Sequence, residues 1–298
     1  MTTLVVALAL LAGSYLVAVI EGWTLTGRLR PAAPLVAGIA LLGRETLVPR
    51  RSDRLLFEIA PYLLLIAAVA ATAVLPLAPE VIVVDLATGA LFVNAAWVYV
   101  MVALLMAGWG PNAAYAMVAG WRFLGQLIAY AMLIVMPLTA VAMRAESLST
   151  TAVVRSQEGL WNVVAQPLGF VLFWFAAMAA SFLPPFDHPI AAYELAGGVA
   201  GEYTGARLAV FRLGRLALIV TFATAVTVFY LGGWFGPVLP PWAWTAGKTL
   251  LVVAAMLVGG RFVPRLRSEH LLAWSWKLGI PLALANILWV GVTLLAAG

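Results

Sequence analysis

The residues best suited to acid–base chemistry lie in one polar segment, Pro184–Arg215, which interrupts long apolar stretches. Glu194 and Glu202 are eight positions apart, about two helical turns, so one helix face could carry both carboxylates. Two carboxylates near an apolar environment bind and release protons as a coupled pair, which suits proton transfer. The alternative is a solvated loop, because three prolines make the start of the segment non-helical. The other polar members are Asp187, His188, Arg207, Arg212 and Arg215.

A second set of polar residues recurs at helical spacing within an apolar stretch. Arg122, Gln126 and Tyr130 occupy positions i, i+4 and i+8, so they form one stripe along a helix. This stripe could line a hydrated channel, or it could form hydrogen bonds with a neighbouring helix. The spacing favours neither interpretation over the other.

The elements that carry these residues must be membrane helices. The chain has 298 residues, of which 64% are hydrophobic and 10% charged, and its mean hydropathy is +1.05. A soluble domain is about 45–50% apolar and about 25% charged, so this composition excludes a soluble enzyme and a disordered chain. One membrane-crossing helix needs about 20 apolar residues. We therefore expect an all-α integral membrane protein with about eight transmembrane helices, in a single polytopic domain over residues 1–298.

The expected transmembrane helices are separated by short polar links. They cover residues 1–20, 58–77, 86–107, 114–143, 166–183, 206–232, 242–262 and 271–297. Between the first two, Leu35, Ile39 and Leu42 recur at helical spacing. This pattern predicts a short interfacial helix after the first transmembrane helix.

The basic residues are divided unevenly between the two sides. Of the 17 Lys and Arg residues, 14 fall on one side, and only Arg144, Arg155 and Lys248 fall on the other. The positive-inside rule makes the first side cytoplasmic and places both termini on the outer side of the cell inner membrane. The chain has no cysteine and only two histidines, His188 and His270, which excludes thiolate metal sites and iron–sulfur ligation. If the protein takes part in redox chemistry, other subunits must carry the electrons.

Six stretches, in the right order, give the chain a resemblance to the H subunit of NADH–quinone oxidoreductase (respiratory complex I). They are LLGRETLVP (41–49), LFEIAPYLLL (56–65), residues 85–131, PFDHPIAAYEL with GEYTG (185–205), FYLGGWFGP (229–237) and residues 264–286. The same family includes the membrane subunit of energy-converting [NiFe] hydrogenases. The PFDxP motif and the C-terminal PRxRxxxLxxxxWK pattern favour complex I, and the corresponding membrane component of a hydrogenase or formate hydrogenlyase is the alternative.

The resemblance implies a non-redox subunit of a proton-translocating oxidoreductase. Such a subunit docks the peripheral redox arm on the cytoplasmic face, forms much of the quinone chamber and starts the proton-coupling path. Quinone is then the substrate, iron–sulfur clusters belong to partner subunits, and antiporter-like membrane subunits complete a hetero-oligomer. No nucleic acid is involved, and no complete active site or metal site is expected within this chain.

The implied roles fall on two groups of residues. The quinone chamber and redox-arm interface would involve Arg28, Arg30, Glu45, Arg122, Gln126 and Arg207. The proton path would involve Asp187, Glu194, Glu202 and Tyr130.

The chain also departs from the family pattern. Ala131, Ile190 and Ala192 stand where the family has glutamates, Ala37 and Ala40 replace an aspartate and a lysine, and Arg215 stands where glutamate is common. Alanine cannot relay a proton. Either the path runs through Glu194, Glu202 and water, or the chain has kept a scaffold role with lost or altered coupling. A stand-alone proton-coupled transporter and a purely structural anchor are the remaining hypotheses.

Overall fold

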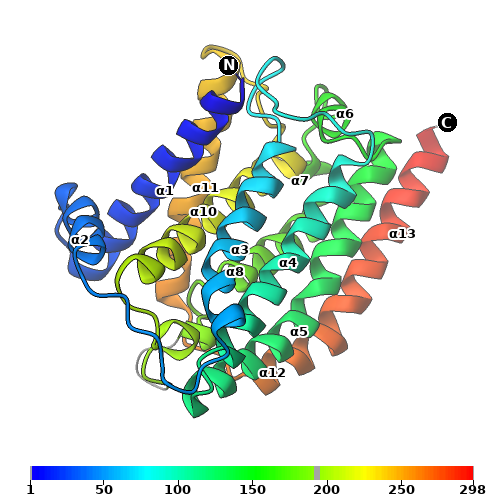
Figure 1. Cartoon of the computed structure of the whole chain (residues 1–298). Coiled ribbons are helices and arrows are strands. Elements are labelled where there is room, and N and C mark those ends of the chain that lie inside the picture. Colours follow the sequence, from blue (N-terminus) through cyan, green and yellow to red (C-terminus); the bar gives the residue numbers. More distant parts are fainter. Residues whose placement is uncertain (1, 191–194, 298) are drawn as a thin grey trace.

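The computed structural model describes residues 2–190 and 195–297, and every element in these ranges is helical (Figure 1). Seven helices are long and apolar enough to cross a membrane. They are α1 (Thr2–Thr26), α3 (Arg54–Ala73), α4 (Gly89–Trp109), α5 (Ala114–Ala145), α10 (Gly205–Tyr230), α11 (Pro241–Phe262) and the C-terminal helix Ser268–Ala296. The prediction of an all-α integral membrane protein is confirmed.

The fifth predicted transmembrane segment, residues 166–183, contains a shorter helix than expected. Helix α8 (Pro167–Ala180) has 14 residues and is about 21 Å long, less than the roughly 30 Å of a bilayer core. The chain beyond both helix ends is buried, as Gln166, Ser181 and Leu183 show. Irregular backbone is tolerated at membrane depth only where protein surrounds it. The fifth crossing therefore combines a short helix with buried non-helical chain.

Successive crossings alternate in direction, so both termini lie at the same end of the bundle, which is the upper end in Figure 1. The links 74–88, 146–166 and 231–240 also lie at this upper end. The opposite, lower end carries the links 27–53, 110–113, 181–204 and 263–267. Short elements within these links are α2 (Ala32–Leu42), α6 (Thr150–Arg155), α7 (Asn162–Ala165), η1 (His188–Ile190) and η2 (Gly198–Ala200).

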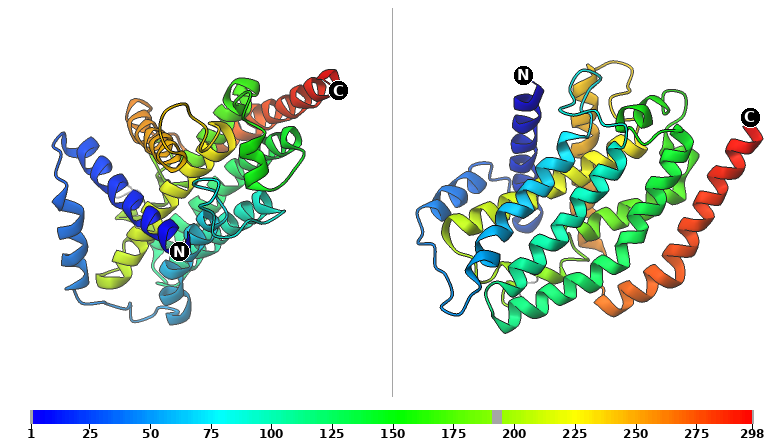
Figure 2. Two further views of the ribbon diagram at one scale, coloured as in Figure 1. Left: turned by 90° about the horizontal axis from the view of Figure 1, so that it is seen from above. Right: turned by 45° about the vertical axis from the view of Figure 1, so that its right-hand side comes forward.

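Helix α10 forms the centre of the bundle, and α1 and α13 (Ile280–Ala297) lie at opposite edges (Figure 2). In the most apolar stretch of α10, 83% of the residues are buried, against 22% in α1. Helix α10 packs on α1, α3 and α11. Its contact with α3 includes a buried hydrogen bond of 2.7 Å between the hydroxyls of Thr72 and Thr221. Such interhelical hydrogen bonds compensate for the weak apolar driving force between helices in lipid.

The C-terminal helix contains a π-helical turn between two α-helical parts. Helix α12 (Ser268–Trp274) passes into a π-helical turn, Ser275–Gly279, which continues as α13. Pro281 follows the π turn and has no N–H to continue the regular ladder, which accounts for the local change. Gly279 faces α5, where an added Cβ would lie 2.7 Å from Cδ2 of Leu133. The glycine allows this helix to approach α5 closely.

A buried lysine binds carbonyl oxygens at the upper end of α10. The Nζ of Lys248, on α11, donates to the carbonyl oxygens of Leu231, Gly233 and Phe235 at 2.6, 3.1 and 2.7 Å. It also lies 4.1 Å from the ring centroid of Trp161, a cation–π contact. The ammonium thus satisfies the carbonyl of the residue that caps α10 and two carbonyls of the loop that follows the helix.

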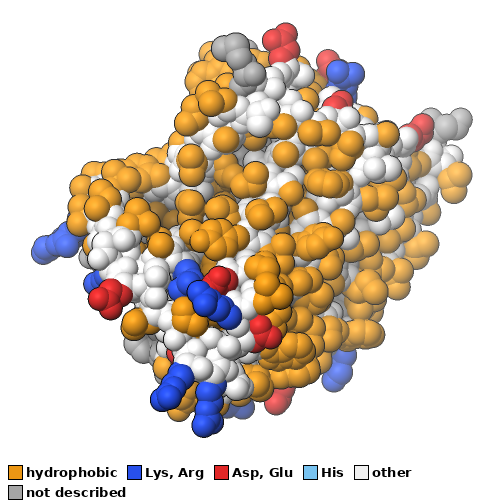
Figure 3. All heavy atoms as spheres, in the orientation of Figure 1, with side chains coloured by type: hydrophobic (Ala, Val, Ile, Leu, Met, Phe, Trp, Pro, Cys, Tyr) orange, Lys and Arg blue, Asp and Glu red, His pale blue; other side chains and the backbone are white. Residues whose placement is uncertain are grey.

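Hydrophobic side chains cover the middle of the face seen in Figure 3, and most charged side chains lie toward its ends. The 14 basic residues expected on one side belong to the lower links or to the lower halves of the helices beside them. Arg144, Arg155 and Lys248 belong to the upper end. This is the charge asymmetry of a protein that spans a membrane.

Candidate functional site at the lower end of the bundle

The link between α2 and α3 lies directly on the start of α10. The backbone N–H of Leu47 donates to Oγ1 of Thr204 at 2.9 Å. Gly205 has a φ of +57°, and a Cβ there would come within 2.7 Å of the carbonyl oxygen of Arg44. Only glycine accommodates both the left-handed conformation and this close approach. Two segments 157 positions apart in sequence are thereby fixed side by side.

A carboxylate on α3 joins the first turns of α3 and α10. Oε1 of Glu58 accepts from Nε of Arg54 at 2.8 Å and from Nη2 of Arg207 at 3.3 Å. The Arg54 side chain is 78% exposed, whereas that of Arg207 is 17% exposed. The guanidinium of Arg207 also lies 5.8 Å from the ring centroid of Phe57. The partly buried Arg207 is therefore held both by charge and by an aromatic face.

Aromatic rings extend this cluster into the bundle. Phe57 and Tyr203 stack with their centroids 4.4 Å apart, and Phe211 lies 5.7 Å beyond Tyr203. The Tyr203 hydroxyl donates to the carbonyl oxygen of Phe57 at 3.1 Å. Burial raises the pKa of Tyr203, and the nearby Arg207 opposes this shift only in part. The phenol therefore stays protonated and acts as a hydrogen-bond donor.

The α8–α10 link reaches across to the α11–α12 link through an ion pair. Oδ2 of Asp187 lies 2.6 Å from Nη2 of Arg265, and the Asp187 side chain is 13% exposed. Its other oxygen, Oδ1, is buried and accepts no hydrogen bond within the described part of the chain. A carboxylate in this state has unused capacity to accept a proton or a further donor.

The polar stripe of α5 faces the same link. The amide of Gln126 is completely buried, and its Nε2 donates to the carbonyl oxygens of Ala179 and Phe186, both at 2.9 Å. Tyr130, one turn further along, is also buried, and Arg122, one turn before, is half-buried. Gln126 therefore forms hydrogen bonds with neighbouring backbone.

The remaining predicted site residues lie on the surface of the lower end or outside the described ranges. Arg28, Arg30, Glu45 and Glu202 are exposed at the lower end. Glu194 lies outside the described residues. The structure thus brings Arg207, Asp187 and Gln126 into specific contacts.

Three ionic or protonatable groups of this end were absent from the predicted site. Glu21 of α1 pairs with Arg215 of α10, with Oε1 and Nη2 2.8 Å apart. Glu58 and His188 take part in the contacts around Arg207 and Gln126. The sequence could have indicated such residues, because a charged residue inside or beside an apolar stretch must be paired or hydrated. That signal marks the residue but does not identify its partner.

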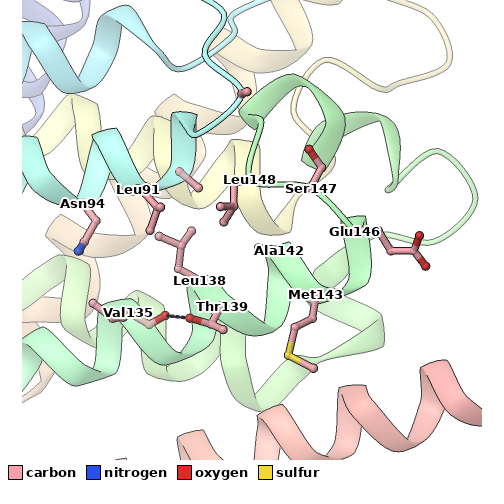
Figure 4. A pocket seen from close by; sticks show the side chains of 12 residues that line it. Leu91, Asn94, Val135, Leu138, Thr139, Ala142, Met143, Glu146, Ser147 and Leu148 are labelled. Atoms are coloured by element: carbon pink, nitrogen blue, oxygen red, sulfur yellow. Dashed lines mark hydrogen bonds between the residues drawn. The ribbon is translucent and has the colours of Figure 1, made fainter.

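A cavity of about 530 Å³ lies far from this charged cluster. It is lined by α4 and α5 at the upper end, including Leu91, Asn94, Leu138, Thr139 and Met143 (Figure 4). Most of its lining is apolar, and Asn94 comes from α4 whereas Thr139 comes from α5. Glu146 is the charged residue among those that line it, so the cavity does not bring together several groups suited to acid–base chemistry.

No group of three or more potential metal ligands is found among residues 2–190 and 195–297. The polar contacts of the lower end are ion pairs, amide hydrogen bonds and aromatic stacking. These groups can bind a polar organic molecule, hold a charged partner surface, or exchange protons.

Comparison with known proteins assigns the family. Residues 3–291 match the family described as NADH dehydrogenase. The chain is 37% identical over 276 residues to the H subunit of the NADH-quinone oxidoreductase of Syntrophotalea carbinolica (strain DSM 2380), an alignment that covers 90% of this chain and 82% of that protein. Both matches extend over nearly the whole chain and agree with the helical membrane fold. The chain therefore belongs to the family formed by the H subunits of NADH–quinone oxidoreductase.

Proposed function

We propose that this protein is the membrane anchor subunit of a complex I-like oxidoreductase and that its lower end docks the peripheral redox arm. The observation that carries this proposal is the concentration of 14 of the 17 basic residues at the lower end. Arg28 and Arg30 are exposed there, on the link that leads from α1 to α2. Exposed positive charge on a membrane protein steers and orients an acidic partner surface.

The contacts between α3 and α10 support a quinone chamber beside this docking surface. A quinone head group is planar and carries two carbonyl oxygens, so it requires aromatic faces and hydrogen-bond donors. Phe57 and Tyr203 stack on each other and form an aromatic wall, and the partly buried guanidinium of Arg207 beside them is a candidate hydrogen-bond donor. Helix α2 is almost entirely exposed and is apolar throughout, which suits a position against lipid or a partner subunit. We propose Glu45, Arg122 and Gln126 as further residues at or beside this chamber.

Proton coupling would begin in the link between α8 and α10. Reduction of a quinone consumes protons, and groups that exchange protons beside the chamber can connect this step to the membrane domain. Asp187 offers a buried carboxylate oxygen, and Glu202 offers an exposed carboxylate. Glu194 and Tyr130 complete the proposed path. This chain contributes proton exchange and positioning, and the electrons pass through iron–sulfur clusters of partner subunits.

The proposed orientation places the lower end in the cytoplasm and both termini on the outer side of the inner membrane. The charge asymmetry supports this orientation, because basic links are retained on the cytoplasmic side. A peripheral arm bound at the lower end would then take its electron donor from the cytoplasm. Antiporter-like membrane subunits would pack against the exposed apolar helices within the bilayer.

Partner identification tests this function. The protein is extracted from its native membrane in mild detergent, and co-purifying chains are identified by mass spectrometry. Iron–sulfur and quinone-reducing subunits together with antiporter-like subunits would support the complex I assignment. A nickel–iron large subunit would transfer the chain to the hydrogenase branch. Recovery of the chain alone as a monodisperse particle would overturn both assignments and favour a stand-alone transporter.

A further inference from the structure

The orientation of one buried amide fixes the chemistry of its neighbour. Nε2 of Gln126 faces the carbonyl oxygens of Ala179 and Phe186, each at 2.9 Å. Carbonyl oxygens only accept hydrogen bonds, so the amide nitrogen must occupy this position. Rotating the amide by half a turn would place its oxygen against two other oxygens. Oε1 of Gln126 is therefore the atom that faces His188.

His188 lies between two acceptors. Its side chain is buried, with 5% exposed. Nδ1 is 3.3 Å from Oε1 of Gln126, and Nε2 contacts the carbonyl oxygen of Leu266. A neutral imidazole has one N–H and one lone pair, so it would direct a lone pair at an oxygen on one side. An imidazolium has an N–H on each nitrogen and satisfies both acceptors.

We propose that His188 is doubly protonated in this arrangement and that its proton fastens the segment 181–190 to α5 and to the α11–α12 link. The segment would then bind a proton when it docks and release it when one of the two contacts breaks. This inference extends the proposed function. It rests on that function in one respect only, which is how the complex uses the proton. His188 acts here as a positioning residue, because it holds the segment that carries Asp187.

The charged groups around His188 are of both signs, and arginines outnumber carboxylates, so the second ring proton rests on the two acceptors alone. On its own segment, Asp187 carries a negative charge that is shared with Arg265 through Oδ2, while Oδ1 remains without a donor within the described residues. On the elements packed against it, Arg122 and Tyr130 lie on α5, one turn before and one turn after Gln126, while Tyr115 and Arg144 lie toward the two ends of that helix. Arg265 and Arg267 lie on the α11–α12 link, and Glu269 and His270 lie on α12. Helix α8, η1 beyond His188 and η2 contribute no charged side chain.

This placement gives the segment an imidazole, the type of side chain that ordinarily exchanges a proton between about pH 5 and 8. Positions 190 and 192 are isoleucine and alanine, whose side chains cannot exchange a proton. A protonatable group at position 188 therefore provides the segment with proton exchange that those two positions lack.

Nitrogen NMR of the imidazole rings tests the proposal directly. The full chain is labelled with ¹⁵N-histidine and reconstituted into lipid nanodiscs at neutral pH. Because the chain has only two histidines, the variant His270→Gln leaves His188 as the single signal, and His270 is exposed on α12. We expect two protonated ring nitrogens. One protonated and one unprotonated nitrogen in the folded protein would overturn the proposal.

Hydrogen exchange provides the second measurement. Amide protection of peptides within 181–190 is compared between slightly acidic and alkaline pH, after correction for intrinsic exchange. Loss of one charge-assisted hydrogen bond is expected to lower protection by about 10- to 100-fold as the pH rises. His188→Gln should abolish this dependence, and His270→Gln should retain it. Equal dependence in both variants would contradict the proposal.

These outcomes are independent of the proposed function. A neutral His188 ring would remove the proton link and leave the docking and family assignments intact. Recovery of the chain without partner subunits would overturn the proposed function, and a doubly protonated ring would remain a property of the fold.

Discussion

Replacing Lys248 with methionine should destabilise the upper end of the bundle, because it removes the donor for the carbonyls of Leu231, Gly233 and Phe235. Hydrogen bonds to a charged group contribute about 1.5–3 kcal/mol each, so three together contribute about 4.5–9 kcal/mol. Burying the ammonium without a carboxylate costs several kcal/mol, and methionine avoids that cost. The net loss of unfolding free energy is therefore about 2–4 kcal/mol.

Thermal unfolding in detergent, followed by the fluorescence of the tryptophans, measures this loss. For a chain of this size, a loss of about 2–4 kcal/mol lowers the Tm by roughly 5–10 °C. Lys277→Met is the matched control, because Lys277 is the other lysine of the chain and is exposed near the lower end. A Tm for Lys248→Met within about 1 °C of the unmodified protein would refute the reasoning.

Two further perturbations concern the lower end. Replacing both Arg28 and Arg30 with alanine should weaken attachment of the peripheral arm by about 2- to 30-fold, since each exposed ion pair contributes about 0.2–1 kcal/mol. The measurement is recovery of the arm on membranes at moderate salt. Arg155 is exposed at the upper end, so Arg155→Ala should not reduce this recovery. An equal loss in Arg155→Ala would contradict the docking proposal. Glu194→Gln or Glu202→Gln should lower proton pumping coupled to turnover while the complex still assembles, and unchanged pumping in both variants would remove them from the path.

The membrane helices were predictable because apolar length is a local property of the sequence. The stretches predicted at 86–107, 206–232 and 242–262 appear as α4, α10 and α11 with ends shifted by only a few residues. The interfacial helix expected around Leu35 and Ile39 appears as α2. In each case, the helix is required by the need to satisfy backbone groups in an apolar environment.

The short helix α8 of the fifth crossing could not be predicted in the same way. The composition of residues 166–183 is as apolar as that of a full crossing, but α8 ends at Ala180. Whether irregular chain is tolerated beyond that point depends on burial by neighbouring elements. Ser181 and Leu183 are completely buried, and this protection comes from the tertiary fold.

The contacts of the candidate site depend on segments that are distant in sequence. Gln126 and His188 are 62 positions apart, and Asp187 and Arg265 are 78 apart. The periodicity of α5 identified Gln126 as part of a polar stripe but left open whether it faces water or backbone. Only the packing of the α8–α10 link against α5 determines its hydrogen-bond partners. Helical spacing therefore identified the residue, and tertiary structure identified its role.

Arg215 shows how a departure from a family pattern can be resolved by structure. A basic residue at this position conflicts with a path made of acids. In the structure, its guanidinium pairs with Glu21 of α1 at 2.8 Å and joins α1 to α10. The pair is partly buried, with the Arg215 and Glu21 side chains 18% and 25% exposed, so the two charges stabilise each other. The residue is thereby explained as an interhelical contact.

Cross-linking from the two ends of the bundle tests whether the lower end docks the peripheral arm. The chain has no native cysteine, so Leu29→Cys, between the two lower-end arginines, and Leu160→Cys, at the upper end, each introduce one exposed thiol without changing any charge. A thiol-reactive cross-linker is applied to the complex in native membranes, and the joined chains are identified by mass spectrometry. We expect Leu29→Cys to be joined to a peripheral redox-arm subunit and Leu160→Cys not to be. Cross-linking of such a subunit to Leu160→Cys instead of Leu29→Cys would contradict docking at the lower end.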